Sequence, residues 1–231
     1  METIQNTPEK LILRIEANQQ LANALRRSIS EIPVLAVDEV EIFKNDSALY
    51  DEVLAHRIGL IPLKTEKSMT AKTKIDFKLS KKGPCTVYAE DLHGAGKIVQ
   101  PKIPITILGE GHQLELVATA RLGKGIDHAK HIPGLCYYRH LLEIKSSLQV
   151  DKIIQNSKGV IKPEKKGAKW ICDIDDASVT EINKIDKEAI KDSDELIFIV
   201  ESYGNMPAKE MLLGAVEALE ENLKYFEKEI K

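Results

Sequence analysis

The chain has 231 residues, of which 43% are hydrophobic and 30% charged, and its formal net charge is −3. This composition is that of a globular chain that can bury a core in one or two domains. The slightly negative net charge argues against a protein that binds nucleic acid by itself, because phosphate binding requires a clustered excess of Lys and Arg. No apolar run suits a signal peptide or a membrane span, so we expect a cytoplasmic protein.

The N-terminal segment predicts a strand, a helix and a second strand. Residues 10–16 are aliphatic and partly alternating, which is typical of a strand. Asn18 can cap a helix over residues 19–31, which carries apolar side chains at helical spacing. Residues 34–43 then alternate apolar and acidic side chains, as a half-buried strand does.

A second helix is expected after a turn at residues 45–47. It covers residues 50–58, and Asp46 or Ser47 is its expected cap. Gly59 follows at the position where a left-handed residue commonly ends a helix.

From residue 65 to about residue 172 the pattern predicts a mostly β segment with loops. The β-like runs are residues 75–79, 85–89, 103–108 and 114–120. Residues 123–134 form one long irregular loop in this prediction. The polar, lysine-rich residues 151–169 are expected to form a loop or a frayed connection.

The C-terminal region predicts a short helix within residues 178–193, a strand over 195–201 and a long helix over 208–229. Asn205 is the expected cap of the long helix, and Pro207 suits its first turn. Apolar residues recur along this helix in two rows with a period of seven. We call them the C-terminal stripe: Leu212, Val216, Leu219, Leu223, Phe226 and Ile230. Because the stripe is wide on a long charged helix, we favour a partner surface over packing against the chain's own sheet alone.

These elements suggest a discontinuous domain. Residues 1–43 and 176–231 supply strand, helix, strand and then strand, helix, while residues 44–175 form a β-rich insert between them. The expected fold class is α+β.

Few residues point to chemistry. His128 and His131 lie beside Asp127, but a zinc site needs three or four converging ligands, so we favour a loop that hydrogen-bonds to itself or to a neighbour. His56 with nearby carboxylates could form an acid–base cluster, and surface ion pairs are the simpler alternative. No phosphate-loop or nucleophile motif appears in the sequence.

The cysteines do not suggest a cross-linked or metal-bound framework. Cys85, Cys136 and Cys172 are odd in number, far apart and not arranged as CxxC. We expect all three to be reduced, and buried or half-buried.

Five blocks of sequence stand out: NALRR at 23–27, AVDEV at 36–40, NDS at 45–47, DEVLAHRIGLIPL at 51–63 and GKGIDHAKHIPG at 123–134. Together they resemble the alpha-like subunits of DNA-directed RNA polymerase, most closely the archaeal form, termed D, which is the counterpart of the eukaryotic third-largest subunit. The resemblance extends over nearly the whole chain. It implies a discontinuous alpha-like dimerisation domain with a β-rich insert, in agreement with the division above.

The resemblance implies an assembly platform within a nucleotidyltransferase complex. The archaeal alpha-like form pairs with a small alpha-like subunit, L, chiefly through its first and last helices. The pair then recruits the second-largest subunit and the small zinc-bearing subunits N and P. The catalytic aspartates and magnesium belong to the largest subunits, so this chain is expected to hold no catalytic residue and to make no direct contact with DNA.

Two sets of contact residues follow from the resemblance. The second-largest subunit is expected to contact the docking set, which is Asn23, Arg26, Arg27, His56, Arg57, Gly59 and Pro62. The small alpha-like subunit L is expected to contact the heterodimer set, which is Leu21, Leu25, Leu212, Val216, Leu219, Leu223 and Phe226. Arginine suits an interface because its rigid guanidinium pairs with carboxylates or carbonyls. An internal salt bridge is the alternative for Arg27.

One departure from the family concerns iron. Several archaeal relatives carry a ferredoxin-like module with iron–sulfur clusters between the positions of Gly134 and Asp173. This segment is short here and holds only Cys136 and Cys172, whereas a cluster takes about four thiolates. We expect the module to be missing and the chain to bind no cofactor or metal.

Two other functions remain as alternatives. One is an enzyme that uses a metal at the His128–His131 loop. The other is a homodimeric module of the bacterial alpha type, in which a separate DNA-binding domain follows the last helix. Because the sequence stops at Lys231, soon after that helix, we favour the heterodimer.

Overall fold

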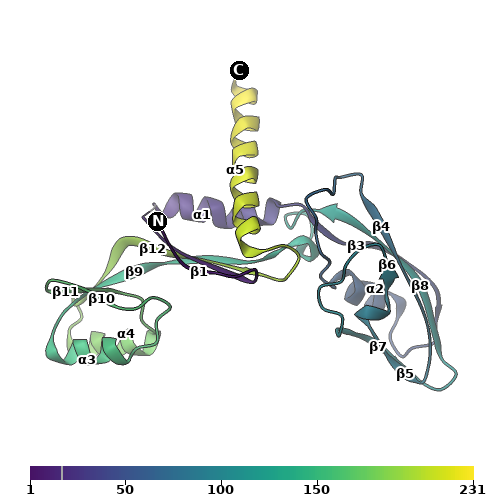
Figure 1. The fold of residues 1–231 in the computed structure, drawn as a ribbon, viewed down its shortest axis with the longest axis horizontal. Helices are drawn as coiled ribbons and strands as arrows, with labels where there is room; N and C mark the ends of the chain where they lie inside the picture. The colour runs from purple at the N-terminus through teal and green to yellow at the C-terminus, as the bar shows by residue number, and fades with distance from the viewer. Residues whose placement is uncertain (17) are drawn as a thin grey trace. The chain divides into compact units, whose positions relative to one another are not determined.

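The computed structural model describes residues 1–16 and 18–231 (Figure 1). Its contacts divide the chain into two compact units. Unit 1 consists of Met1–Asn6, Leu11–Ala24 and Cys136–Ile199. Unit 2 consists of Thr7–Lys10, Leu25–Leu135 and Val200–Lys231.

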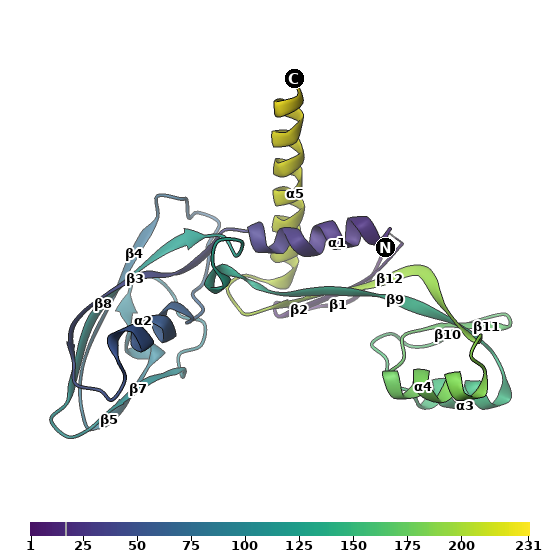
Figure 2. The ribbon, with the colours of Figure 1, turned by 180° about the vertical axis from the view of Figure 1, so that it is seen from behind.

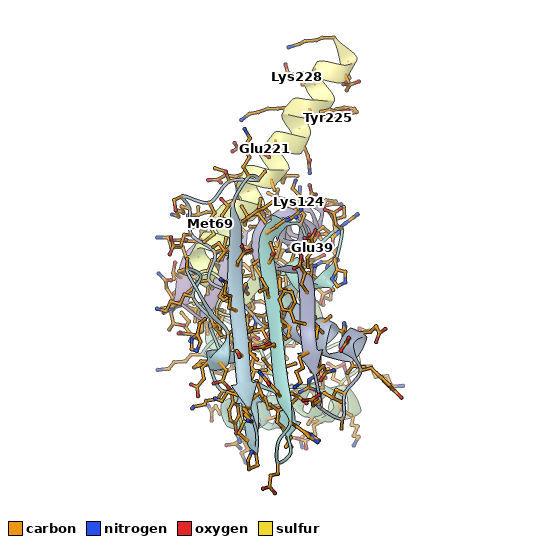
Figure 3. The ribbon with its side chains drawn as sticks, turned by 90° about the vertical axis from the view of Figure 1, so that its right-hand side faces the viewer. Glu39, Met69, Lys124, Glu221, Tyr225 and Lys228 are labelled. Atoms are coloured by element: carbon orange, nitrogen blue, oxygen red, sulfur yellow. The ribbon has the colours of Figure 1, made fainter. Side chains whose placement is uncertain are left out.

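Unit 2 is built on an antiparallel sheet with the strand order β3-β8-β4-β6. Its strands are β3 (Val34–Asn45), β8 (Gln113–Gly123), β4 (Lys74–Lys82) and β6 (His93–Gly94). A second pair joins β5 (Cys85–Tyr88) to β7 (Pro104–Leu108). Figure 3 views the larger sheet from its outer face and labels Glu39 there. The predicted β-rich segment is confirmed in this unit.

Alternation along these strands explains the core of unit 2. In β8 every second side chain from Leu114 to Ala120 is buried, and the residues between them are partly exposed. Helix α2 (Asp51–Gly59) covers the buried face and contributes Leu54 and Ile58 to the same cluster. One face of the sheet is therefore dry and the other meets solvent, as is common for antiparallel sheets.

Unit 1 holds most of a sheet with the order β1-β2-β12-β9-β11-β10. Its strands are β1 (Glu2–Asn6), β2 (Lys10–Glu16), β12 (Ile190–Ser202), β9 (Gly134–Lys145), β11 (Lys169–Cys172) and β10 (Glu164–Lys166). Helices α3 (Leu148–Asn156) and α4 (Asp176–Ile185) lie side by side in both views (Figures 1 and 2). Their buried residues pack with Ile144 and Trp170 in one cluster.

The two remaining helices carry the predicted partner surfaces. Helix α1 (Gln19–Ser28) begins at the expected cap, because Asn18 Oδ1 accepts a hydrogen bond from the Leu21 amide at 2.8 Å. A short 3₁₀ turn (Ile29–Glu31) follows it. Helix α5 (Ala208–Ile230) is the long terminal helix that the sequence predicted.

Two predicted caps of α2 were wrong. Tyr50 holds the N-cap position and makes no side-chain cap. Asp46 Oδ2 instead accepts from the Gln113 amide at 2.9 Å, and Ser47 Oγ accepts from the Leu49 amide at 3.3 Å. The predicted left-handed Gly59 was also wrong, since Gly59 is the last helical residue and positive φ does not occur there.

Two further predictions need correction. Pro207, not Asn205, occupies the N-cap position of α5, and the buried Asn205 donates from Nδ2 to the Leu63 carbonyl at 2.9 Å. Residues 151–169 are not simply a loop, because they include most of α3 and all of β10. Val150 and Ile154 are buried, and this burial supports a helix in an otherwise polar sequence.

The two compact units do not follow the predicted domain boundaries. The prediction joined residues 1–43 with 176–231 in one domain and placed residues 44–175 in the other. Residues 136–175 belong to unit 1, where β11 pairs with β9, while residues 25–135 belong to unit 2. The predicted division into dimerisation and insert domains therefore stays a prediction about function.

Candidate partner-docking surfaces

Helix α5 buries one face and presents most of the C-terminal stripe outward. Met211, Ala215 and Ala218 are buried. Leu223 is 61% exposed, Phe226 64% and Ile230 69%, and Val216 is also exposed. Leu212 and Leu219 are half-buried. Most of the stripe therefore does not pack against the rest of unit 2.

The last part of α5 extends beyond the other elements of its unit. Every residue from Glu221 to Lys231 is exposed. No other ribbon runs beside this part of the helix in either view (Figures 1 and 2), and Figure 3 labels Tyr225 and Lys228 on it. A long helix with exposed Leu and aromatic side chains is the kind of apolar surface that marks a protein–protein contact.

Helix α5 contacts the turn that follows α1 at two places. Asn222 Nδ2 donates to Glu31 Oε2 at 2.8 Å. An added Cβ at Gly214 would lie 3.4 Å from the Ile32 side chain, which is an ordinary van der Waals distance. Helix α5 and this turn are therefore in contact within unit 2.

Helix α1 exposes both members of its arginine pair. Arg26, Arg27 and Leu21 are exposed, while Asn23 and Leu25 are half-buried. The Arg27 side chain forms no salt bridge with any residue in the described part of the chain, so the predicted alternative of an internal ion pair was wrong for those residues.

The remaining docking residues lie on and just after α2. His56 and Arg57 are exposed, and Arg57 Nη2 donates to the Pro104 carbonyl at 2.6 Å. Gly59 and Pro62 are half-buried, and the Pro62 carbonyl accepts from the Val99 amide at 3.0 Å. The backbone after α2 is thus fixed, while the imidazole and guanidinium side chains face solvent.

The structure brings His56 close to the His128 loop, which sequence spacing did not predict. Both histidines line a cavity of about 120 Å³, together with residues of β3 and α2. Lys130 Nζ lies 3.0 Å from Asp38 Oδ1 in the same cavity, and this hydrogen bond holds the pKa of Asp38 below its usual value. The His128–His131 loop therefore belongs to the same surface as α2.

The predicted self-bonded loop is confirmed. His128 Nδ1 accepts from the Lys130 amide at 3.1 Å, and the buried His131 donates from Nδ1 to the Val34 carbonyl at 2.8 Å. Burial lowers the pKa of His131, so its neutral form predominates near neutral pH. Within residues 1–16 and 18–231, no cluster of three His, Cys, Asp or Glu side chains could hold a metal ion.

The cysteines occupy the expected environments. Cys172 is buried, and burial raises the pKa of its thiol to about 12. Cys85 and Cys136 are half-buried. Cys136 and Cys172 are too few for a cluster of the usual kind, so the residues present between Gly134 and Asp173 do not fit an iron–sulfur group.

One polar cluster was missed by sequence reasoning. In unit 1 the mostly buried Arg14 donates from Nε to Glu195 and from Nη1 to Glu164 Oε1 at 2.9 Å. These carboxylates raise the pKa of Arg14, and Arg14 lowers the pKa of Glu195. The three residues are far apart in sequence, so no local pattern signals the cluster.

Comparison with known proteins assigns the chain to a family. A family model described as the RNA polymerase Rpb3/RpoA insert domain matches residues 29–135. DNA-directed RNA polymerase subunit Rpo3 of Thermococcus kodakarensis is 49% identical over 140 residues, which span 56% of this chain and 54% of that relative. Rpo3 of Pyrococcus horikoshii is 35% identical across 86% of this chain and 84% of its own length. Rpo3 of Methanobrevibacter smithii is 30% identical across 98% and 96%.

These matches agree with the mixed helix and sheet architecture and with the β-rich insert. None of the helices in the described residues is long and apolar enough to cross a membrane. The predicted resemblance is thereby confirmed: the chain belongs to the archaeal Rpo3 family of alpha-like, third-largest subunits, also termed D, and is a subunit of DNA-directed RNA polymerase.

Proposed function

We propose that the chain is a non-catalytic assembly platform of its polymerase and that it forms a heterodimer with a small alpha-like subunit, L. The exposed C-terminal stripe carries this proposal. Burying a side chain such as Leu223 or Phe226 contributes roughly 1.5–3 kcal/mol. Several such side chains together offset much of the roughly 4–15 kcal/mol that association costs. Leu21 and Leu25 on α1 are also proposed to contact L, since Leu21 is exposed and Leu25 is half-buried.

The second-largest subunit is proposed to contact the docking set. The exposure of Arg26, Arg27 and His56 supports this role. Arg57 uses one nitrogen to bond Pro104, and its remaining donors can reach a partner's carboxylate or carbonyl. Gly59 and Pro62 shape the backbone that presents these side chains. The small subunits N and P are proposed to join the same assembly.

Catalysis and DNA contact are proposed to lie with other subunits, and this chain is proposed to bind no cofactor. Support comes from the wide separation of the three cysteines in the sequence and from the absence of a three-ligand cluster in the residues described. The compartment that follows from this role is the one that holds the DNA template, which in an archaeal cell is the cytoplasm.

Co-expression with the small alpha-like subunit L of the same organism tests the proposal. Size-exclusion chromatography with light scattering should give a 1:1 complex, and metal analysis of the peak should give no iron. A double change of Leu223→Glu and Phe226→Glu should abolish the complex. The control is Leu148→Glu, which introduces one glutamate at an exposed leucine of unit 1 and should leave the complex intact.

Other outcomes would support the alternatives. A homodimer that ignores L would favour the bacterial alpha type. A monomer that retains stoichiometric metal would favour the enzyme with a metal at the His128–His131 loop. Either result would refute the heterodimer.

A further inference from the structure

A groove of about 420 Å³ runs along α5 on the flank opposite the C-terminal stripe, and all of its lining belongs to unit 2. Its apolar surface comes from four separate stretches of the chain. Those side chains are Ile32, Met69, Leu122, Met206 and Leu213. The volume falls within the roughly 300–1,000 Å³ typical of binding pockets.

The helix geometry separates this groove from the proposed heterodimer surface. At three places along α5 a groove residue, a buried residue and a stripe residue follow one another directly in the sequence. In the order groove, buried and stripe, the triplets are Glu210–Met211–Leu212, Gly214–Ala215–Val216 and Glu217–Ala218–Leu219. One residue turns an α-helix by about 100°. At these three places the groove and the stripe therefore face in well-separated directions.

The groove has apolar surface to offer. Leu213 is 52% exposed, and Met69 and Leu122 are half-buried. Gly214 lines the groove without contributing a side chain. An incoming aliphatic side chain would gain contacts with all of these groups.

The charge of the rim specifies the partner. Glu66, Glu210 and Glu217 line the groove with a single cation, Lys67, whose Nζ lies 3.4 Å from Glu210 Oε1. Three carboxylates and one ammonium give a net charge of −2 in the lining. An apolar side chain flanked by Lys or Arg matches both the floor and the rim.

We propose that the groove docks a segment of another polymerase subunit, distinct from the one on the stripe, that carries aliphatic side chains flanked by Lys or Arg. The inference needs only that the chain works within a polymerase. It does not depend on which subunit covers the C-terminal stripe.

Photo-crosslinking in the assembled polymerase tests the groove. The full chain would carry p-benzoylphenylalanine at Leu213 in one sample and at Leu223 in another, and crosslinked peptides would be identified by mass spectrometry. Leu213 should crosslink to a basic, aliphatic segment of a subunit other than the one that Leu223 reaches. No crosslink from Leu213, or a crosslink to an acidic segment or to a second copy of this chain, would overturn the inference.

A charge reversal supplies the matched comparison. Glu217→Lys should lower the Leu213 crosslink about fivefold, the scale expected for an exposed charge pair. Glu229→Lys makes the same change on α5 outside the groove lining and should leave the crosslink unchanged. Equal yields in the two variants would overturn the charge argument. If Leu223 crosslinks to the small alpha-like subunit while Leu213 crosslinks to nothing, the groove inference fails and the heterodimer stands.

Discussion

Gly123 lies at the end of β8, where the His128–His131 loop packs against it. Replacing Gly123 with alanine should destabilise unit 2. A Cβ at this position would lie 2.4 Å from His131 Nε2, which is far inside van der Waals contact. The imidazole cannot easily move away, because it is buried and its Nδ1 is bonded to the Val34 carbonyl. A methyl group at position 123 would force the imidazole out of this position, and the His131–Val34 hydrogen bond would weaken as a result.

The magnitude follows from three contributions. Overpacking a filled site costs roughly 1–3 kcal/mol. Weakening the His131–Val34 bond costs up to about 0.5–1.5 kcal/mol. Removing a glycine from a strand restores roughly 0.5–1 kcal/mol. We expect Gly123→Ala to lower the free energy of unfolding by about 1–3 kcal/mol.

Urea unfolding followed by circular dichroism measures this change. Gly59→Ala is the matched control, because a Cβ there would meet only the Val37 carbonyl at 3.8 Å in the last turn of α2. That variant should be as stable as the parent or slightly more so. If Gly123→Ala matches Gly59→Ala, the proposed packing of His131 against the end of β8 is wrong.

Three further predictions concern buried charge, pH and metal. Arg14→Met should cost about 3 kcal/mol of stability, because Glu195 and Glu164 lose their common partner; an unchanged urea midpoint would contradict this. The pKa of His131 is lowered from 6.5, so the unfolded state binds its proton first as the pH falls. The contribution of neutral His131 to the free energy of unfolding should therefore be fully present above pH 6.5 and should fall as the pH drops from there toward the folded pKa. His131→Gln should remove this pH dependence from urea titrations at several pH values. Plasma emission analysis of the purified heterodimer should detect no stoichiometric iron, and a cluster with its visible absorption would refute the prediction of a cofactor-free chain.

Local periodicity was enough to predict much of the secondary structure. The aliphatic run at residues 10–16, the cap at Asn18 and the alternating strand around residues 114–120 all appear in the structure. In each case neighbouring residues supply the signal, because side-chain direction repeats every two residues in a strand and every 3.6 in a helix. The family blocks likewise lie in continuous sequence, so the resemblance could be identified without coordinates.

The same reasoning from local sequence gave the wrong helix caps where a side chain contacts a residue far away in the sequence. Asp46 has the side chain of a helix cap, yet it bonds the Gln113 amide across the sheet, 67 positions away. Asn205 likewise bonds Leu63, 142 positions away. A polar side chain that suits a cap also suits any unpaired backbone group that the fold brings near it, and sequence does not reveal which is nearer.

For the partner surfaces, the sequence by itself determined that α5 is long, charged and apolar along more than one row. Only the tertiary structure decided which row faces inward. Met211, Ala215 and Ala218 face inward, while larger stripe residues such as Leu223 stay exposed. The spacing of residues along a helix defines its faces, but the distance to the neighbouring element decides which face can be buried.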